Sequence, residues 1–264
     1  MAEVIGMADE TIEWAPLAAT VRTALAQKVR QQLRPPGSGL CGWQPRYDER
    51  VVAVAGMTGS VGATTVSLAL ASVATLTGPA RIIECAPPTR SGLTAAAAAE
   101  LGTGRGGWTR GQREGVTLIR RSSTSLFDAA PPPPEGEGTF TVLDVGDLLT
   151  DRPGEHSIAA DVAGGWVLVA RASVPCLRQL ELVLDLALVH NPTLAIVGTP
   201  PRRWPTRLAS AIQPRTRELL ESGRVVTFRP DRRLSITGLT PDPLPRHVAA
   251  SARTLLTILE GLPQ

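Results

Sequence analysis

The chain has 264 residues, of which 43% are hydrophobic, 19% charged and only 3% aromatic. This balance is typical of a globular protein, and the length suits one large α/β domain, or one domain with a short appendage. The net charge of +3 is too small to indicate a nucleic-acid partner by itself.

The first predicted element is a helix over about residues 16–34, which would form an N-terminal arm. Leucine or valine recurs every fourth residue along it, and Pro16 stands where a first helical turn tolerates proline. The Pro-Pro-Gly sequence at 35–37 is expected to end this helix and to begin a linker. We therefore expect a helical arm and linker at 1–49 and the main domain at 50–264. The arm is expected to dock on the domain, with a partner or a membrane surface as the alternatives.

From residue 51 onward, strands and helices are predicted to alternate. Short apolar runs predict strands at 51–55, 81–85, 116–119, 140–144, 166–170, 194–197 and 225–228. Helices are predicted at 63–76, 94–101, 177–190 and 247–262, and a proline-rich surface loop at 129–138. This alternation predicts an α/β fold with a doubly wound, mostly parallel sheet of about seven strands flanked by helices. A core poor in aromatic residues suits such buried parallel strands.

The most informative segment is residues 51–71, VVAVAGMTGSVGATTVSLALA, where an apolar strand leads through a glycine-rich turn into a helix. The glycines of this turn let the backbone wrap closely around an anion, with its N–H groups pointing inward. The helix N-terminus adds its partial positive charge. A hydroxyl in the first helical turn, Thr64 or Thr65, is where a phosphate loop places its magnesium ligand. The segment therefore predicts a phosphate-binding loop; the alternative is a tight turn without a ligand.

Residues 58–65, TGSVGATT, resemble the deviant Walker A loop KGGVGKTT of the ParA/MinD family, which belongs to the SIMIBI class of ATPases. The family's signature lysine corresponds to Thr58, and its Walker lysine corresponds to Ala63. Lys28 is the only lysine of the chain, so the loop carries neither. The resemblance implies a P-loop NTPase fold of the ParA/MinD type over about residues 51–262.

The missing lysines remove what charged side chains supply to such a loop. A charge-assisted hydrogen bond contributes roughly 1.5–3 kcal/mol, so losing the Walker contact costs on the order of 10- to 100-fold in affinity. Turnover suffers more, because phosphoryl transfer depends on cations that stabilise the transition state. We therefore expect weak or no ATP hydrolysis and assign no catalytic residue. Backbone amides and Mg²⁺ can still hold ATP or ADP, with an arginine such as Arg90 in partial compensation.

Two further landmarks of the family follow in order. Residues 81–87, RIIECAP, resemble its second-strand motif, in which Glu84 remains while Ala86 replaces the acid thought to handle the attacking water. Residues 142–146, VLDVG, resemble Walker B, where Asp144 would hold magnesium through water. The resemblance thus implies a magnesium site and supports the fold more strongly than it supports ATP hydrolysis.

The region around the nucleotide base also has counterparts. Gly198 replaces an adenine-contacting asparagine, and residues 225–243 resemble the family's last strand and the loop around the base. The resemblance implies that nucleotide is bound by Gly59, Ser60, Val61, Gly62, Ala63, Thr64, Thr65 and Asp231. It implies that the metal is held by Thr64, Asp144 and Glu84.

With alanine in place of the Walker lysine, residues 56–65 resemble the TadZ/CpaE branch, whose members help place pilus machinery at a defined cell site. Septum-site-determining proteins look similar. That branch often carries an N-terminal receiver domain, for which the roughly 50 residues before the loop are too few. The resemblance implies a positioning or assembly factor that acts as a homodimer or with a protein partner. The positioning factor is expected to be either nucleotide-gated or inactive, and one alternative is a scaffold subunit that binds no nucleotide.

A rival function is that of a partition factor that binds DNA without sequence preference. Arginines are concentrated between residues 200 and 235, where acids are sparse, and such binding depends on the number of phosphates neutralised. The other explanation is a solvated surface that happens to carry arginines. The arginines that would contact DNA are Arg202, Arg203, Arg207, Arg215, Arg232 and Arg233.

The three cysteines, Cys41, Cys85 and Cys176, are far apart and match no metal-ligand spacing, which is typical of a reduced intracellular protein. The N-terminus does not resemble a signal peptide, and no apolar run reaches the roughly 18 residues that span a bilayer. We therefore expect a cytoplasmic protein whose contact with membranes is peripheral at most.

Overall fold

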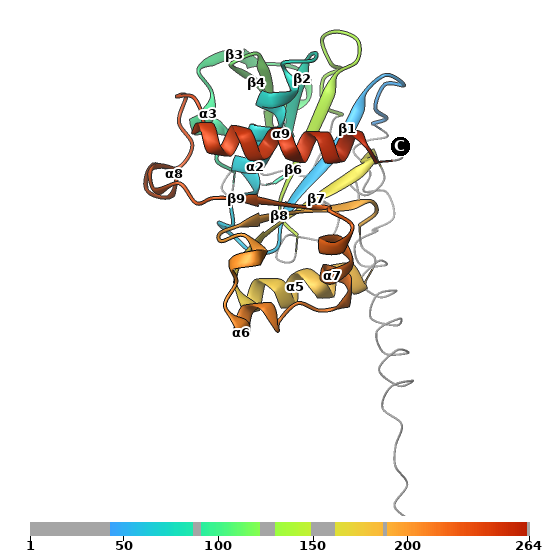
Figure 1. The fold of residues 1–264 in the computed structure, drawn as a ribbon. Coiled ribbons are helices and arrows are strands. Elements are labelled where there is room, and N and C mark those ends of the chain that lie inside the picture. Colours follow the sequence, from blue (N-terminus) through green and yellow to red (C-terminus); the bar gives the residue numbers. More distant parts are fainter. Residues whose placement is uncertain (1–42, 87–90, 122–129, 149–161, 187–188, 263–264) are drawn as a thin grey trace, which may run out of the picture.

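The computed structural model describes residues 43–86, 91–121, 130–148, 162–186 and 189–262. The predicted N-terminal helix and Arg90 lie outside these residues. One twisted sheet forms the centre of the molecule, with α2 and α9 on one face and α5 and α7 on the other (Figure 1). The helices of the described part are α2 (Ala63–Ala74), α3 (Leu93–Ala96), α5 (Val174–Asp185), α6 (Thr206–Ala209), α7 (Pro214–Glu221), α8 (Arg232–Thr237) and α9 (Arg246–Glu260).

The sheet has nine strands within the described residues, in the order β3-β4-β5-β2-β6-β1-β7-β8-β9. All neighbours from β5 through to β9 pair in parallel, which confirms the predicted mostly parallel α/β sheet. The strands are β1 (Arg50–Gly56), β2 (Ala80–Glu84), β3 (Ala99–Thr103), β4 (Trp108–Arg113), β5 (Val116–Arg121), β6 (Phe140–Asp147), β7 (Gly165–Arg171), β8 (Pro192–Val197) and β9 (Val225–Phe228).

The prediction of a helix over residues 94–101 is wrong. The helix α3 ends at Ala96, and the following residues form β3, which pairs antiparallel with β4. The alanine run favours a helix, but it leads into a glycine-rich stretch in which Gly102 has φ +92° and Gly106 has φ +73°. Glycine destabilises a helix interior by about 1 kcal/mol relative to alanine, and these left-handed values end any helix. This hairpin supplies the two strands beyond the seven predicted.

Each face of the central strands packs into its own apolar layer. Val54 of β1 packs with Leu68 of α2 in one cluster, whereas Ala55 packs with Leu168 and Leu177 in the other. Side chains of successive strand residues point to opposite faces, so a strand between two helical layers is apolar throughout. That is why the continuous apolar runs of the sequence predict these strands correctly. Each fully buried leucine or valine contributes about 1.5–3 kcal/mol to the stability of the fold.

The chain before β1 is tied to the sheet by a buried ion pair. Glu49 accepts hydrogen bonds from Arg81 Nε, at 3.1 Å, and from the Thr141 hydroxyl. Arg81 also donates to the Pro132 carbonyl at 2.6 Å, and its guanidinium lies 5.9 Å from the centre of the Trp43 ring. Burial lowers the pKa of Arg81, and the Glu49 carboxylate opposes that shift. The pair thus joins the entry segment, β2, β6 and the proline-rich loop.

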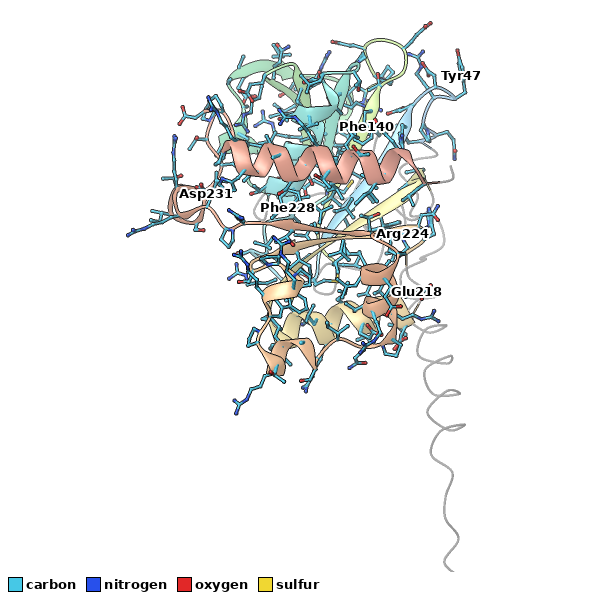
Figure 2. The ribbon with its side chains drawn as sticks, viewed as in Figure 1. Tyr47, Phe140, Glu218, Arg224, Phe228 and Asp231 are labelled. Atoms are coloured by element: carbon cyan, nitrogen blue, oxygen red, sulfur yellow. The ribbon has the colours of Figure 1, made fainter. Side chains whose placement is uncertain are left out.

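The aromatic residues labelled in Figure 2 differ in how much of their side chain is exposed to solvent. Phe140 and Phe228 are buried at the start of β6 and the end of β9, whereas Tyr47 is 96% exposed. Within the described residues, no helix is both long and apolar enough to cross a membrane.

Candidate nucleotide-binding site

The glycine-rich turn between β1 and α2 is held in a defined conformation. Ser60 and Gly62 both adopt left-handed φ values, +57° and +100°. Val61 between them is buried, and a Cβ added to Gly56 would lie 2.8 Å from its Cγ1. The loop therefore needs glycine at 56 so that Val61 can pack beneath it.

The start of α2 offers unsatisfied backbone donors. Gly62 is the N-cap, so no side chain caps the helix, and the first turn contains no acidic residue. The first N–H groups of an α-helix lack partners within the helix, and together with the helix dipole they favour an anion. The loop and the helix start are thus shaped to bind phosphate through the backbone.

Replacing Gly56 with alanine is expected to lower the stability of the protein by about 1–3 kcal/mol, because Val61 and the loop must move to make room. Denaturant unfolding measures the change. The matched control is Gly78→Ala, where the nearest atom to an added Cβ is 3.7 Å away, an ordinary contact. Equal stabilities of the two variants would contradict the tight packing of Val61 under the loop.

Two buried carboxylates lie side by side below the start of α2. Glu84 and Asp144 are partner residues on the adjacent parallel strands β2 and β6, and both are fully buried. The Ser67 hydroxyl donates to Asp144 Oδ1 at 3.2 Å, and the backbone N–H of Arg121 donates to Glu84 Oε2 at 2.9 Å. Within the described residues, Asp144 Oδ2 has no hydrogen bond that meets normal geometry.

The pKa of Asp144 is raised to about 7, chiefly by burial and in part by the neighbouring Glu84, against the opposing effect of the Thr64 and Ser67 hydroxyls. Burial likewise raises the pKa of Glu84, against hydrogen bonds from Ser91 and the Arg121 N–H and the charge of nearby arginines. A buried carboxylate with an unpaired oxygen is costly unless a cation or a proton neutralises it. The pair therefore favours a cation at this point.

The donor set fits magnesium. No group of three or more His, Cys, Asp or Glu side chains in the described residues is arranged to hold a metal ion. Mg²⁺ does not need one, because it usually binds one or two carboxylates and fills its other positions with water and substrate phosphate. Thr64 and Asp144, with Glu84 beside them, would supply the protein oxygens next to a phosphate on the loop.

The structure brings most of the predicted site residues together. Residues 59–65 form the loop and the first turn of α2, directly above Asp144 and Glu84. Asp231 is instead the N-cap of α8, where its Oδ1 accepts from the Leu234 N–H at 3.0 Å (Figure 2). This bond gives Asp231 a structural role in α8, whether or not it also meets a nucleotide.

Gly198 at the end of β8 has a structural reason to be glycine. Its φ is +143°, and an added Cβ would lie 2.8 Å from the Ala172 Cβ. The asparagine that the family resemblance leads us to expect at this position would not fit. Position 198 therefore offers a base no side-chain contact.

Arg171 is a residue beside the loop that sequence reasoning missed. It ends β7, and its guanidinium donates to the Ser60 carbonyl at 3.0 Å. Its backbone N–H donates to Cys176 Sγ at 3.2 Å. The direct pairing of β7 with β1 places Arg171 beside the loop, and because the sequence does not state the order of the strands, it gave no signal for this contact.

The arginines of residues 200–235 are spread over several elements. Arg202 and Arg203 lie in a short 3₁₀ turn after β8, and Arg207 lies in α6. Arg215 in α7 is 3.5 Å from Glu218, and Arg233 in α8 pairs with Asp242. Acidic neighbours thus offset part of the positive charge on α7 and α8, so these arginines form no single basic element.

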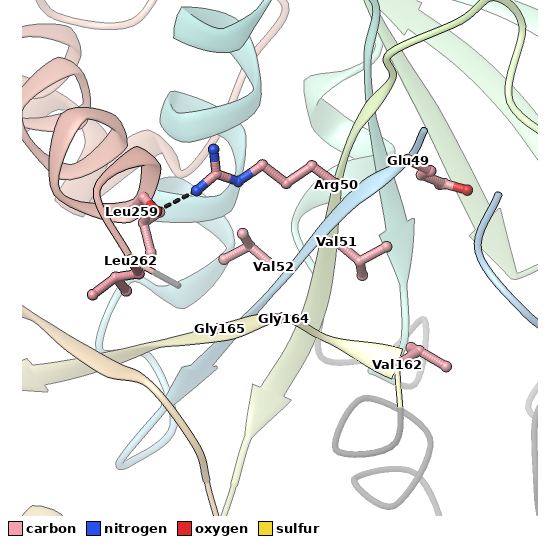
Figure 3. Close-up of a pocket in the computed structure, with 9 residues that line it drawn as sticks. All are labelled: Glu49, Arg50, Val51, Val52, Val162, Gly164, Gly165, Leu259 and Leu262. Carbon is pink, nitrogen blue, oxygen red and sulfur yellow. Dashed lines mark hydrogen bonds between the residues drawn. The ribbon is translucent and has the colours of Figure 1, made fainter. Parts of the chain in front are cut away.

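A cavity lies at the other end of the sheet, away from the loop (Figure 3). Its lining includes Val51 and Val52 near the start of β1, Gly164 just before β7 with Gly165 at its start, and Leu259 of α9. Arg50 reaches across it to donate to the Leu259 carbonyl at the C-terminal end of α9. Because cations are favoured at a helix C-terminus, Arg50 stabilises α9. The cavity lies at the opposite end of the sheet from the phosphate loop and is a separate feature.

Taken together, the parallel sheet, the glycine-rich loop between its first strand and α2, and the acid on the neighbouring strand define the P-loop NTPase type of fold. No family model matches the chain, and no curated protein matches its sequence. Solved structures do match, and they are ATPases of the ParA/MinD type.

Three of these structures illustrate the likeness. A McdA variant of Cyanothece in complex with ATP has a TM-score of 0.55 and 13% identity, over 82% of this chain and 99% of that one. The cell division protein MinD of Aquifex aeolicus has a TM-score of 0.51 and 13% identity, over 81% and 99%. A putative plasmid partition protein of Borrelia burgdorferi bound to AMPPNP has a TM-score of 0.50 and 11% identity, over 83% and 99%. At these identities the likeness shows the fold.

Proposed function

We propose that this chain is a ParA/MinD-like positioning or assembly factor that binds ATP or ADP with Mg²⁺ and hydrolyses ATP weakly or not at all. The observation that carries the proposal is the unpaired, fully buried Asp144 oxygen beneath the uncapped start of α2. A cation would neutralise the Asp144 carboxylate, and a phosphate on the loop would accept hydrogen bonds from the N–H groups at the start of α2. The structures with bound ATP and AMPPNP support nucleotide as the source of the phosphate.

The expectation of weak hydrolysis rests on three positions. Thr58 and Ala63 stand where the family's loop carries lysines, and Ala86 stands where its second strand carries an acid. All three lie in the described structure. The buried methyl group of Ala86 has no polar atom that could position the attacking water. Alanine at position 63 also supports the TadZ/CpaE branch, whose members place machinery in the cell. We propose that the protein works there as a homodimer or with a protein partner, as MinD of Aquifex aeolicus does with MinC.

Calorimetric titration with ATP and ADP, with and without Mg²⁺, tests this function. We expect binding that requires Mg²⁺, with little phosphate release over hours. The informative variant is Ala63→Lys, which restores a charged donor and is expected to tighten binding on the order of 10- to 100-fold. No heat at millimolar nucleotide from the unaltered protein would refute nucleotide binding and leave a scaffold with an ATPase fold. Rapid phosphate release would refute the loss of hydrolysis.

A further inference from the structure

We infer that Arg171 binds the phosphate groups of the nucleotide and supplies the positive charge that the loop lacks, an inference that rests on the proposed nucleotide binding. The loop itself contains no lysine, because Lys28 is the only one in the chain. Arg171 reaches the loop from β7, more than a hundred positions later in the sequence, and its guanidinium meets the Ser60 carbonyl at 3.0 Å.

The strand order places Arg171 next to the loop. The end of β1 pairs with β7, where Gly56 is the partner of Val169. Val167 and Val169 pack in the apolar cluster that contains α2. Because side chains alternate along a strand, Arg171 belongs to the same face, which is the face onto which the loop turns to begin α2.

The backbone at Arg171 is held by hydrogen bonds, and the contact with the Ser60 carbonyl orients its exposed side chain. Its N–H donates to Cys176 Sγ, and the next residue, Ala172, donates to the Val197 carbonyl at 3.1 Å. Ala172 also packs against Gly198, where no side chain would fit. A side chain on such a base loses less freedom on binding a ligand than one on a mobile loop.

The guanidinium has donors left for a ligand. Within the described residues Arg171 forms no ion pair, and its Nη2 contacts an uncharged carbonyl. Arginine presents five N–H donors in a planar fork, which matches two phosphate oxygens at once. One donor can stay on Ser60 while others bind phosphate. The carboxyl groups of Asp144 and Glu84, which would hold a magnesium ion, lie beneath the start of α2, whereas Arg171 contacts the loop at Ser60.

The test compares Arg171→Ala and Arg171→Lys with the unaltered protein in titrations with ATP, ADP, AMP and adenosine in the presence of Mg²⁺. We expect Arg171→Ala to weaken ATP binding by about 10- to 100-fold, ADP less, and adenosine not at all. Arg171→Lys should recover part of the loss, because lysine keeps the charge without the fork. The control is Arg178→Ala, an exposed arginine on α5, which should leave the affinity for ATP unchanged.

Three outcomes would overturn the inference, and each is distinguishable. If the unaltered protein binds ATP and Arg171→Ala binds it equally well, the inference fails while the proposed function stands. If Arg171→Ala weakens ATP and adenosine alike, Arg171 only shapes the loop. If the unaltered protein binds no nucleotide, the proposed function and the inference fail together. Matching melting temperatures of all variants establish that each one is folded.

Discussion

Replacing Glu49 with alanine is expected to lower the free energy of unfolding by about 3–5 kcal/mol, because it leaves the buried guanidinium of Arg81 without its counter-charge. The side chains of Glu49 and Arg81 are only 1% and 3% exposed. Removing one partner of a buried pair costs more than the pair contributes, since the remaining charge keeps its desolvation penalty. Unfolding in guanidinium chloride measures the loss. We expect the midpoint concentration of denaturant to fall, while the dependence of the unfolding free energy on denaturant stays unchanged.

The matched control is Glu135→Ala, which also breaks an arginine–glutamate pair. Glu135 pairs with Arg110 but is 69% exposed, so its removal is expected to cost no more than about 1 kcal/mol. Replacing both members of the buried pair, as in Glu49→Leu with Arg81→Met, should recover much of the stability lost by Glu49→Ala. A Glu49→Ala protein as stable as the control would show that water reaches Arg81.

The metal-free protein is expected to lose stability as the pH rises from about 5 to about 8, and Asp144→Asn is expected to remove most of that loss. The pKa of Asp144 is about 7 in the folded protein, raised from its ordinary value of 3.8. Since the folded state holds the proton more tightly, the stabilising contribution of protonated Asp144 is complete below pH 3.8. It is lost as the pH rises towards the folded-state pKa and through it.

The expected size follows from the same linkage. Each pH unit in which only the folded state holds the proton changes stability by about 1.4 kcal/mol, so Asp144 accounts for roughly 2–3 kcal/mol across this pH range. The measurement is denaturant unfolding at several pH values in the presence of a chelator. Asparagine cannot titrate, so the curve of Asp144→Asn should be flatter by this amount. Parallel curves for the two proteins would mean that Asp144 is already ionised in the fold.

Much of the fold can be predicted because buried parallel strands are apolar on both faces. The strand at residues 51–55 and the turn that follows it are recognisable from a few adjacent positions, as is the acid at the end of residues 140–144. Local sequence fails where propensity and tertiary packing disagree. The alanines of residues 94–101 favour a helix, yet the glycines that follow and the pairing of β3 with β4 decide the outcome.

Some residues of the candidate site can be recognised from the sequence, and others can be recognised only from the structure. The loop and Asp144 are visible in the sequence because each is part of a contiguous motif. Arg171 is not, because its proximity to Ser60 depends on the order of strands in the sheet, which the sequence alone does not state. The structural role of Asp231 is also a matter of local geometry, since the same acid can cap α8 or face a ligand.

The hairpin of β3 and β4 bears on how copies of the protein can associate. It makes β3 the outermost strand on one side of the sheet, and all five of its residues are exposed. The pairing of β3 with β4 shifts register between Glu100 and Gly102, and the left-handed Gly102 bends the edge. Bulged, bent edges are poor templates for another strand. The β3 edge is therefore a poor place for two copies to join their sheets into one.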